Sequence, residues 1–310
     1  MGNPYVISAE LDLANAELEQ IVRPEAIDGF RESLDADLRS MGKETLWVPS
    51  STMQSGLEQV IAQTALPVVS LDDRYVSSAD QFLGISRGVK PQRTTDYPLM
   101  QSGAPLWPTT LVDDGYVPRR GYPAIDEQLD KVSSLGKEVL LVDDVLFSGE
   151  MVAWLADALR QRGVKIGAVA VGIAIGEGIE KLEAENIEVT ASEIFDEVED
   201  EICERDFAVV PGSGRRIESF QSNVLYFDAE YGKPEQWASI PGKSVGEFAV
   251  RSFGRAAELI AKGTPISALG EFRGVKQRTI GRLFGPEVDA AEALRFNACR
   301  FLPGKFYTNL

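Results

Sequence analysis

A strongly apolar run that ends in two aspartates constrains the fold of this chain more than any other feature. Residues 139–142 read Val-Leu-Leu-Val, and Asp143 and Asp144 follow directly. A continuous apolar run of this kind is typical of a strand buried on both faces of a parallel sheet. Ser148 and Gly149 then form a short turn before helix-forming residues begin. The segment predicts a strand, a tight turn and a helix in immediate succession.

The same alternation continues after this segment. Helical patterns at 151–161 and 179–185 alternate with apolar strand patterns at 165–174 and 187–190. Strands that alternate with helices at this spacing indicate a parallel sheet with crossover helices. A receiver domain also has a strand ending in Asp-Asp, but its phosphoacceptor aspartate ends a later strand. Residues 167–172 contain no aspartate, and we therefore reject that alternative.

The rest of the chain divides into three expected parts. Residues 1–40 read as an N-terminal helical segment, 41–215 as the α/β domain, and 216–310 as a smaller appended region. Helices are expected at 8–41, 56–64, 124–135, 245–262 and 289–299, and strands at 67–71 and 82–86, with a short strand from Glu44 that runs into a polar turn by Thr52.

Composition excludes several classes of function. The 310-residue chain has a net charge of −17, which argues against nucleic-acid binding and against an anionic membrane surface as a partner. It contains no histidine, so a histidine base or histidine-ligated zinc is excluded. Two cysteines are too few for a disulfide framework or a Cys₄ zinc site. With no signal pattern in residues 1–10, we expect a cytoplasmic protein.

The Asp-Asp turn has the chemistry of a sugar-phosphate site. Ligands of open α/β sheets lie at the carboxyl ends of the strands. A helix that begins just after such a strand offers its N–H groups and dipole to a phosphate. Asp143 and Asp144 could accept hydrogen bonds from ribose hydroxyls or ligate a hydrated Mg²⁺. The alternative is an ordinary strand-to-helix turn with two solvated aspartates.

The segment resembles the phosphoribosyl diphosphate (PRPP) signature of the type I phosphoribosyltransferases. That signature has four apolar residues, two acidic residues and then Thr-Gly-Gly-Thr or a close relative. Asp143 and Asp144 match the acidic pair, Gly149 matches a glycine, and Ser148 replaces the first threonine. The resemblance implies a type I phosphoribosyltransferase-like α/β fold, with a phosphate loop over residues 147–151.

Three residues depart from the signature. Phe147 occupies a position that is an acidic base-assisting residue in several members of the family. Glu150 places a negative charge where it would repel a 5′-phosphate, and Met151 removes a hydroxyl donor. Glu150 and Met151 favour a second alternative, a non-catalytic module of the same fold that binds PRPP or a nucleotide, whereas the intact acidic pair and the arginine-bearing stretch favour the enzyme.

The resemblance also assigns roles elsewhere. Residues 50–52 are expected as the pyrophosphate loop, although a plain helix cap is an equal alternative. The long stretch 88–121 is expected to be a mobile lid, partly a β-hairpin, or disordered. Segments 203–207 and 211–216 have arginines beside a glycine turn, and could form an acceptor-binding loop.

The expected function is Mg²⁺-dependent transfer or release of a phosphoribosyl group, with PRPP or a nucleoside monophosphate as the small-molecule partner. An enzyme that acts on an existing nucleoside phosphate is a further possibility, and assembly as a homodimer is left open. The expected catalytic residues are Asp143, Asp144, Arg87, Arg93, Arg119 and Arg120, with Asp143 and Asp144 also at the metal. The expected substrate-binding residues are Ser50, Ser51, Thr52, Val145, Leu146, Phe147, Ser148, Gly149, Glu150 and Met151.

Overall fold

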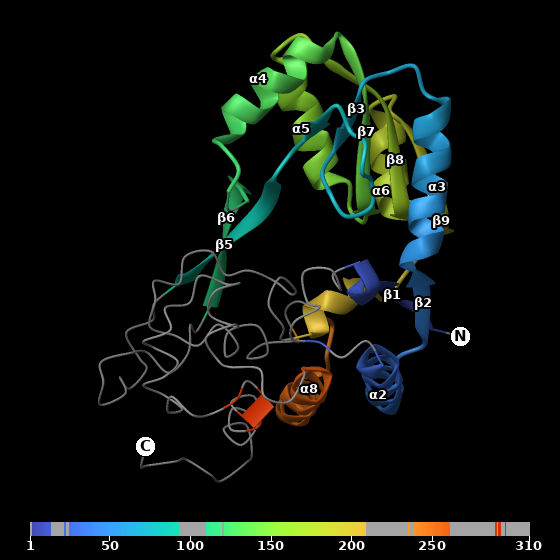
Figure 1. Cartoon of the computed structure of the whole chain (residues 1–310), viewed down its shortest axis with the longest axis vertical. Helices are drawn as coiled ribbons and strands as arrows, with labels where there is room; N and C mark the ends of the chain where they lie inside the picture. Colours follow the sequence, from blue (N-terminus) through green and yellow to red (C-terminus); the bar gives the residue numbers. More distant parts are fainter. Residues whose placement is uncertain are drawn as a thin grey trace. The chain divides into compact units, whose positions relative to one another are not determined.

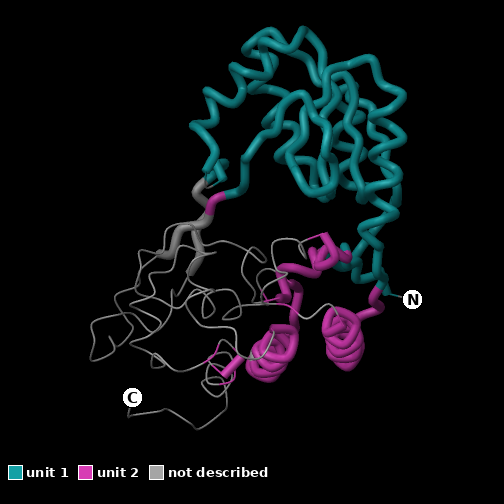
Figure 2. The backbone as a smooth tube through the Cα atoms, viewed as in Figure 1, with its two compact units in different colours: residues 1–8, 46–87, 115–201 teal, residues 9–45, 88–114, 202–310 magenta. Residues whose placement is uncertain are grey.

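The computed structural model describes most of the first two thirds of the chain and less of the remainder. The described residues are 2–13, 22, 25–92, 110–119, 121–208, 235, 238–260, 289, 291–292 and 295. They divide between two compact units (Figure 2). Unit 1 comprises residues 1–8, 46–87 and 115–201, and unit 2 comprises 9–45, 88–114 and 202–310. The segments expected at the N-terminus and the C-terminus thus fall largely within one unit.

A parallel sheet forms the centre of unit 1 (Figure 1). Its strand order is β4-β3-β7-β8-β9, and every neighbouring pair is parallel. The strands are β3 (Val68–Ser70), β4 (Gln81–Phe82), β7 (Glu138–Leu146), β8 (Lys165–Ile175) and β9 (Glu188–Phe195). The predicted parallel α/β fold is confirmed. Its cause is the apolar run of β7, in which all four residues of 139–142 are buried.

Helices cover both faces of this sheet. The helix α3 (Ser50–Gln63) contacts β8 and β9 on one face, and Figure 1 shows it opposite α5 (Glu150–Arg160). The helices α4 (Ile125–Leu135) and α6 (Gly176–Ala184) accompany α5. Leu129 of α4, Leu155 of α5 and Leu182 of α6 belong to one buried cluster with alternate residues of β7 and β8. This packing fixes the carboxyl end of β7 against the start of α5.

Two further strands lie largely within the stretch expected as a lid. They are β5 (Ile85–Gln92) and β6 (Thr110–Pro118), and they pair with each other. The hairpin alternative is confirmed as far as the structure describes these residues. The intervening residues 93–109 lie outside the described part of the chain.

The N-terminal prediction was wrong at its start. Ser8 and Ala9, expected at the beginning of a helix, are the last two residues of the strand β1 (Tyr5–Ala9), whose five residues are all buried. It lies between β2 (Thr45–Pro49) and β10 (Asp200–Cys203) in a three-stranded sheet. A short buried strand without alternation is hard to distinguish from a helix by pattern alone. The later part of the prediction is confirmed by the helix α2 (Ala26–Ser40).

Unit 2 contains α2 and a second long helix, α8 (Val245–Leu259), which pack against each other. Buried Arg255 of α8 donates to Asp37 of α2 at 2.7 Å. The short 3₁₀ helix Glu204–Phe207 follows β10, and Phe207 contacts Phe248 edge to face at 6.0 Å. No helix among the described residues has both the length and the apolar character needed to cross a membrane.

Candidate sugar-phosphate site

The predicted acidic pair lies within β7 instead of after it. The strand continues to Leu146, and Asp143 pairs in register with Val171 of β8. The strand was expected to end at Val142 because two aspartates normally discourage strand formation. The sheet hydrogen bonds override that local preference. As a result the backbone at the two carboxylates is held by the sheet.

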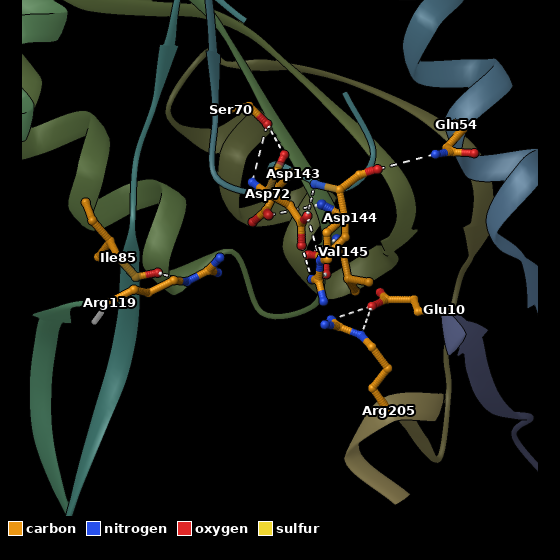
Figure 3. A network of polar contacts seen from close by, with 11 residues as sticks. Glu10, Gln54, Ser70, Asp72, Ile85, Arg119, Asp143, Asp144, Val145 and Arg205 are labelled. Carbon is orange, nitrogen blue, oxygen red and sulfur yellow. Dashed lines mark hydrogen bonds and ion pairs between the residues drawn. The ribbon is translucent and has the colours of Figure 1, made fainter. Parts of the chain in front are cut away.

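The two aspartates differ in exposure. Asp143 is 4% exposed, whereas the Asp144 side chain is 26% exposed. The Asp143 carboxylate accepts the Asp144 N–H at 3.0 Å, and the Asp144 carboxylate accepts the Val145 N–H at 2.9 Å (Figure 3). Asp144 is therefore the member of the pair that a ligand can reach without rearrangement.

A third carboxylate, that of Asp72, lies near the pair, and the sequence analysis did not identify it. It follows β3, the neighbour of β7, and is 1% exposed. The backbone at Asp72 is held by Ser70, whose hydroxyl donates a hydrogen bond to the Asp72 carbonyl oxygen at 2.6 Å (Figure 3). The available signal was the apolar strand 67–71 ending in two aspartates, the same pattern as at 139–144.

Burial controls the charge of these carboxylates. It raises the pKa of Asp143 to about 6, although the Asp144 hydrogen bond and the Arg119 charge oppose the rise. Burial also favours a raised pKa for Asp72, but there the hydrogen bonds and charge of Arg74 prevail and hold the pKa below its ordinary value. The site thus combines a buried carboxylate that titrates near neutrality with one that stays ionised.

The segment 147–151, expected as a phosphate loop, forms a shorter turn than expected. The turn comprises Phe147, Ser148 and Gly149, and Glu150 already begins α5. Gly149 has a φ of 70°, a left-handed conformation that glycine adopts without strain. The Ser148 hydroxyl accepts the Glu150 N–H at 3.4 Å, as a residue before a helix often does. The N-terminus of α5 is therefore presented directly after the acidic strand.

A close backbone contact constrains the turn at residues 147–149. A side chain at Gly178, in the first turn of α6, would place its Cβ 2.4 Å from the Phe147 carbonyl oxygen. Such a distance is never tolerated without movement of the backbone. The loop conformation therefore depends on the absence of a side chain at Gly178.

Glu150 forms an ion pair with Arg87, an arginine to which the sequence analysis gave a different role. Arg87 of β5 donates to the Glu150 carboxylate at 2.9 Å, and both side chains are about half exposed. Arg87 was expected to stabilise the departing charge. In the structure it instead pairs with the carboxylate that was expected to repel a phosphate.

The other predicted residues are placed as follows. Arg119 lies at the end of the β5–β6 pair, where its Nε donates to the Ile85 carbonyl at 3.1 Å (Figure 3). Its charge lowers the pKa of Asp72 and Asp143, so it acts on the same site. Arg93 and Arg120 lie outside the described residues. Val145 and Leu146 belong to β7 and precede the loop.

Residues 50–52, expected to form a pyrophosphate loop, lie in a helix, so the loop prediction was wrong. Ser50, Ser51 and Thr52 form the first turn of α3, after Pro49 in an extended conformation. Hydroxyl residues are common at helix starts as well as in loops, so the pattern did not separate the two. Ser50 is 6% exposed. The turn still leaves N-terminal helix N–H groups at the carboxyl end of β2.

The expected acceptor loop at residues 203–207 is also not a loop. Glu204 is fully buried, accepts from Arg31 Nε at 2.7 Å and accepts the Leu11 N–H at 3.0 Å. Arg205 pairs with buried Glu10. These contacts join three segments of unit 2, so the charged motif has a structural role there. Residues 211–216 lie outside the described part of the chain.

The residues suit a hydrated magnesium ion only in part. Mg²⁺ usually takes one or two carboxylates and completes its shell with water and substrate oxygens. Asp144 could supply such a carboxylate, whereas Asp143 is covered. Among the described residues no cluster of three or more acidic or cysteine side chains is arranged to hold a metal.

Comparison with known proteins gives partial matches. No family model matches the chain. A hypoxanthine/guanine phosphoribosyltransferase of Methanohalophilus mahii is 39% identical over 54 residues, which is 17% of this chain and 28% of that protein. This chain therefore matches less than a third of the length of that curated relative.

Solved structures with similar folds include two further phosphoribosyltransferases. The adenine phosphoribosyltransferase of Thermoanaerobacter pseudethanolicus is 10% identical, with 47% of this chain and 80% of that one covered and a TM-score of 0.29. The orotate phosphoribosyltransferase of Mycobacterium tuberculosis, in complex with inorganic phosphate, is 16% identical, with 47% and 70% covered and a TM-score of 0.26.

Proposed function

Unit 1 has a type I phosphoribosyltransferase-like fold, and we propose that it binds PRPP or a nucleoside monophosphate and transfers or releases the phosphoribosyl group with Mg²⁺. One observation carries the proposal. The partly exposed Asp144 lies two residues before the end of the buried parallel strand β7, and the turn at residues 147–149 leads from that strand to the N-terminus of α5. The Asp144 carboxylate, which can accept hydrogen bonds from hydroxyls, therefore lies a few residues before the helix N-terminus, whose N–H groups can bind phosphate.

The proposed roles follow from the contacts. Asp144 accepts hydrogen bonds from the ribose hydroxyls, and the N–H groups of residues 147–151 hold the 5′-phosphate. Arg119, whose charge already acts on Asp72 and Asp143, stabilises negative charge as the bond from C1 to pyrophosphate breaks. Mg²⁺, bound with the diphosphate, would neutralise charge on the leaving group. The Arg87–Glu150 pair reduces the repulsion between Glu150 and the phosphate.

A non-catalytic binding module remains the second candidate, and a specific observation favours it. Arg87, which a catalytic lid would direct at pyrophosphate, is held by Glu150 at the start of α5. In this alternative the same site binds PRPP or a nucleotide and no bond is broken.

Calorimetric titration with PRPP and Mg²⁺ tests the proposal. We expect the parent chain to bind, and Asp144→Ala to bind at least about tenfold more weakly, because a hydrogen bond to a charged group contributes roughly 1.5–3 kcal/mol. Asp126→Ala is the matched control, since the Asp126 side chain is 86% exposed in a surface ion pair with Arg162. That variant should bind as the parent does.

A second assay separates the enzyme from the module. The chain is incubated with PRPP, Mg²⁺ and a panel of nucleobases, and released pyrophosphate is measured. Release that depends on one base identifies the transferase, whereas binding without release identifies the module. Failure of the parent chain to bind either PRPP or any nucleoside monophosphate at millimolar concentration would exclude both.

A further inference from the structure

Arg74 is a cation beside the acidic pair that the sequence did not single out. It follows β3 in the same segment as Asp72. Its backbone N–H donates to Asp72 Oδ1 at 2.7 Å and its Nε donates to the same oxygen at 2.8 Å. A third contact joins Nη2 to the other oxygen of Asp72. The Asp72 side chain is 2% exposed, so a buried, ionised carboxylate fixes the Arg74 side chain from one side.

The same guanidinium group reaches the neighbouring strand. Arg74 Nη2 lies 3.7 Å from Asp144 Oδ2. The Val145 N–H donates to the other oxygen, Asp144 Oδ1, at 2.9 Å (Figure 3). Each oxygen of the Asp144 carboxylate therefore has a partner of its own. The backbone of Arg74 is held as well, because its carbonyl oxygen accepts from Gln54 Nε2 of α3 at 3.3 Å.

We infer that Arg74 is a positioning residue that holds the Asp144 carboxylate in the orientation required to accept hydrogen bonds from two neighbouring hydroxyls of a ribose. The inference rests on the proposed function for the identity of the ligand. Its physical basis is preorganisation: a carboxylate fixed before binding loses less conformational entropy when the ligand arrives. Arg74 acts through Asp144, and buried Asp72 acts through Arg74.

The variants must separate positioning from folding. Arg74→Ala would leave Asp72 buried without its cation, which is costly enough to unfold a marginal chain. The double variant Asp72→Asn with Arg74→Gln removes both charges together and keeps polar groups at both positions. Arg74→Lys is the conservative comparison, since lysine keeps the charge but lacks the planar fork that contacts two carboxylates.

The first readout needs no ligand. Amide hydrogen exchange is compared at Val145, which donates to the Asp144 side chain, and at Leu140, which donates to the Pro67 carbonyl in the same sheet. We expect Val145 to exchange at least tenfold faster in the double variant, with a smaller increase in Arg74→Lys and no change at Leu140. Equal acceleration at both amides would mean that Arg74 only stabilises the sheet, and no change at Val145 would overturn the inference.

The second readout uses two simple probes, ribose 5-phosphate and inorganic phosphate. We expect the double variant to bind ribose 5-phosphate at least about tenfold more weakly than the parent and to bind phosphate equally well, because phosphate contacts only the 147–151 loop. Equal affinity of parent and variant for ribose 5-phosphate would refute the role of Arg74 and leave the proposed function standing. If the parent binds neither probe, the proposed function fails, and the Val145 comparison still decides whether Arg74 positions Asp144.

Discussion

Replacement of Glu204 by alanine should lower the free energy of unfolding by about 3 kcal/mol, the lower part of the range for breaking a buried ion pair. Glu204 is fully buried and accepts from two nitrogens of Arg31, at 2.7 and 3.0 Å, and from the Leu11 N–H. Burial raises the pKa of Glu204, and the hydrogen bond and charge of Arg31 oppose that rise. Without the carboxylate, Arg31 and the Leu11 N–H lose their shared partner in unit 2.

Urea denaturation followed by circular dichroism measures this effect. The matched control is Asp157→Ala, which breaks an ion pair with Arg160 whose side chains are 65% and 60% exposed. Exposed pairs of this kind contribute about 0.2–1 kcal/mol. A loss for Glu204→Ala no larger than that of the control would show that the motif at 203–207 does not hold unit 2 together.

Replacement of Asp143 by asparagine should stabilise the chain in a pH-dependent manner. Burial raises the pKa of Asp143 from 3.8 to about 6, so the folded chain favours the protonated form. The favourable contribution of this group is therefore complete below about pH 4 and is lost as the pH rises through 6. A shift of about two units corresponds to roughly 3 kcal/mol. Asparagine is neutral at every pH and avoids this loss.

The test compares the unfolding free energies of parent and Asp143→Asn at pH 4.5 and pH 7.5. We expect the variant to gain about 2 kcal/mol relative to the parent between these pH values, because the unfolded-state carboxyl group is already mostly ionised at pH 4.5. The control Asp126→Asn removes an exposed carboxylate, and its unfolding free energy relative to the parent should show no comparable gain between the two pH values. A difference between parent and Asp143→Asn that does not change with pH would mean that Asp143 is ionised in the folded chain at low pH.

The sequence predicted the parallel sheet because its signal is local and strong. The run at residues 139–142 is too apolar for any exposed position, and its helix follows at once. The turn at Ser148 and Gly149 was identifiable for the same reason, since a left-handed glycine before a helix is a local requirement. The part of the site that lies on one continuous segment was therefore predictable.

The remaining parts of the site depend on residues distant in the sequence. Arg74 resembles any surface arginine until β3 and β7 are aligned in one sheet, which brings it to Asp144. The contact between Arg87 of β5 and Glu150 at the start of α5 depends on how these two elements pack, which no local pattern shows. Glu204 belongs to a charged stretch that looks exposed, and its burial depends on a partner more than 170 residues earlier in the chain. No local pattern records such pairings.

The most direct test of the proposed function is amide hydrogen exchange of the whole chain with and without PRPP and Mg²⁺. We predict slower exchange at residues 144–153, which contain Asp144, the phosphate loop and the first turn of α5. The helix α8 of unit 2 should exchange at the same rate in both samples. Slower exchange confined to unit 2, or none in a sample where calorimetry shows binding, would contradict the assignment of the site to the carboxyl end of β7.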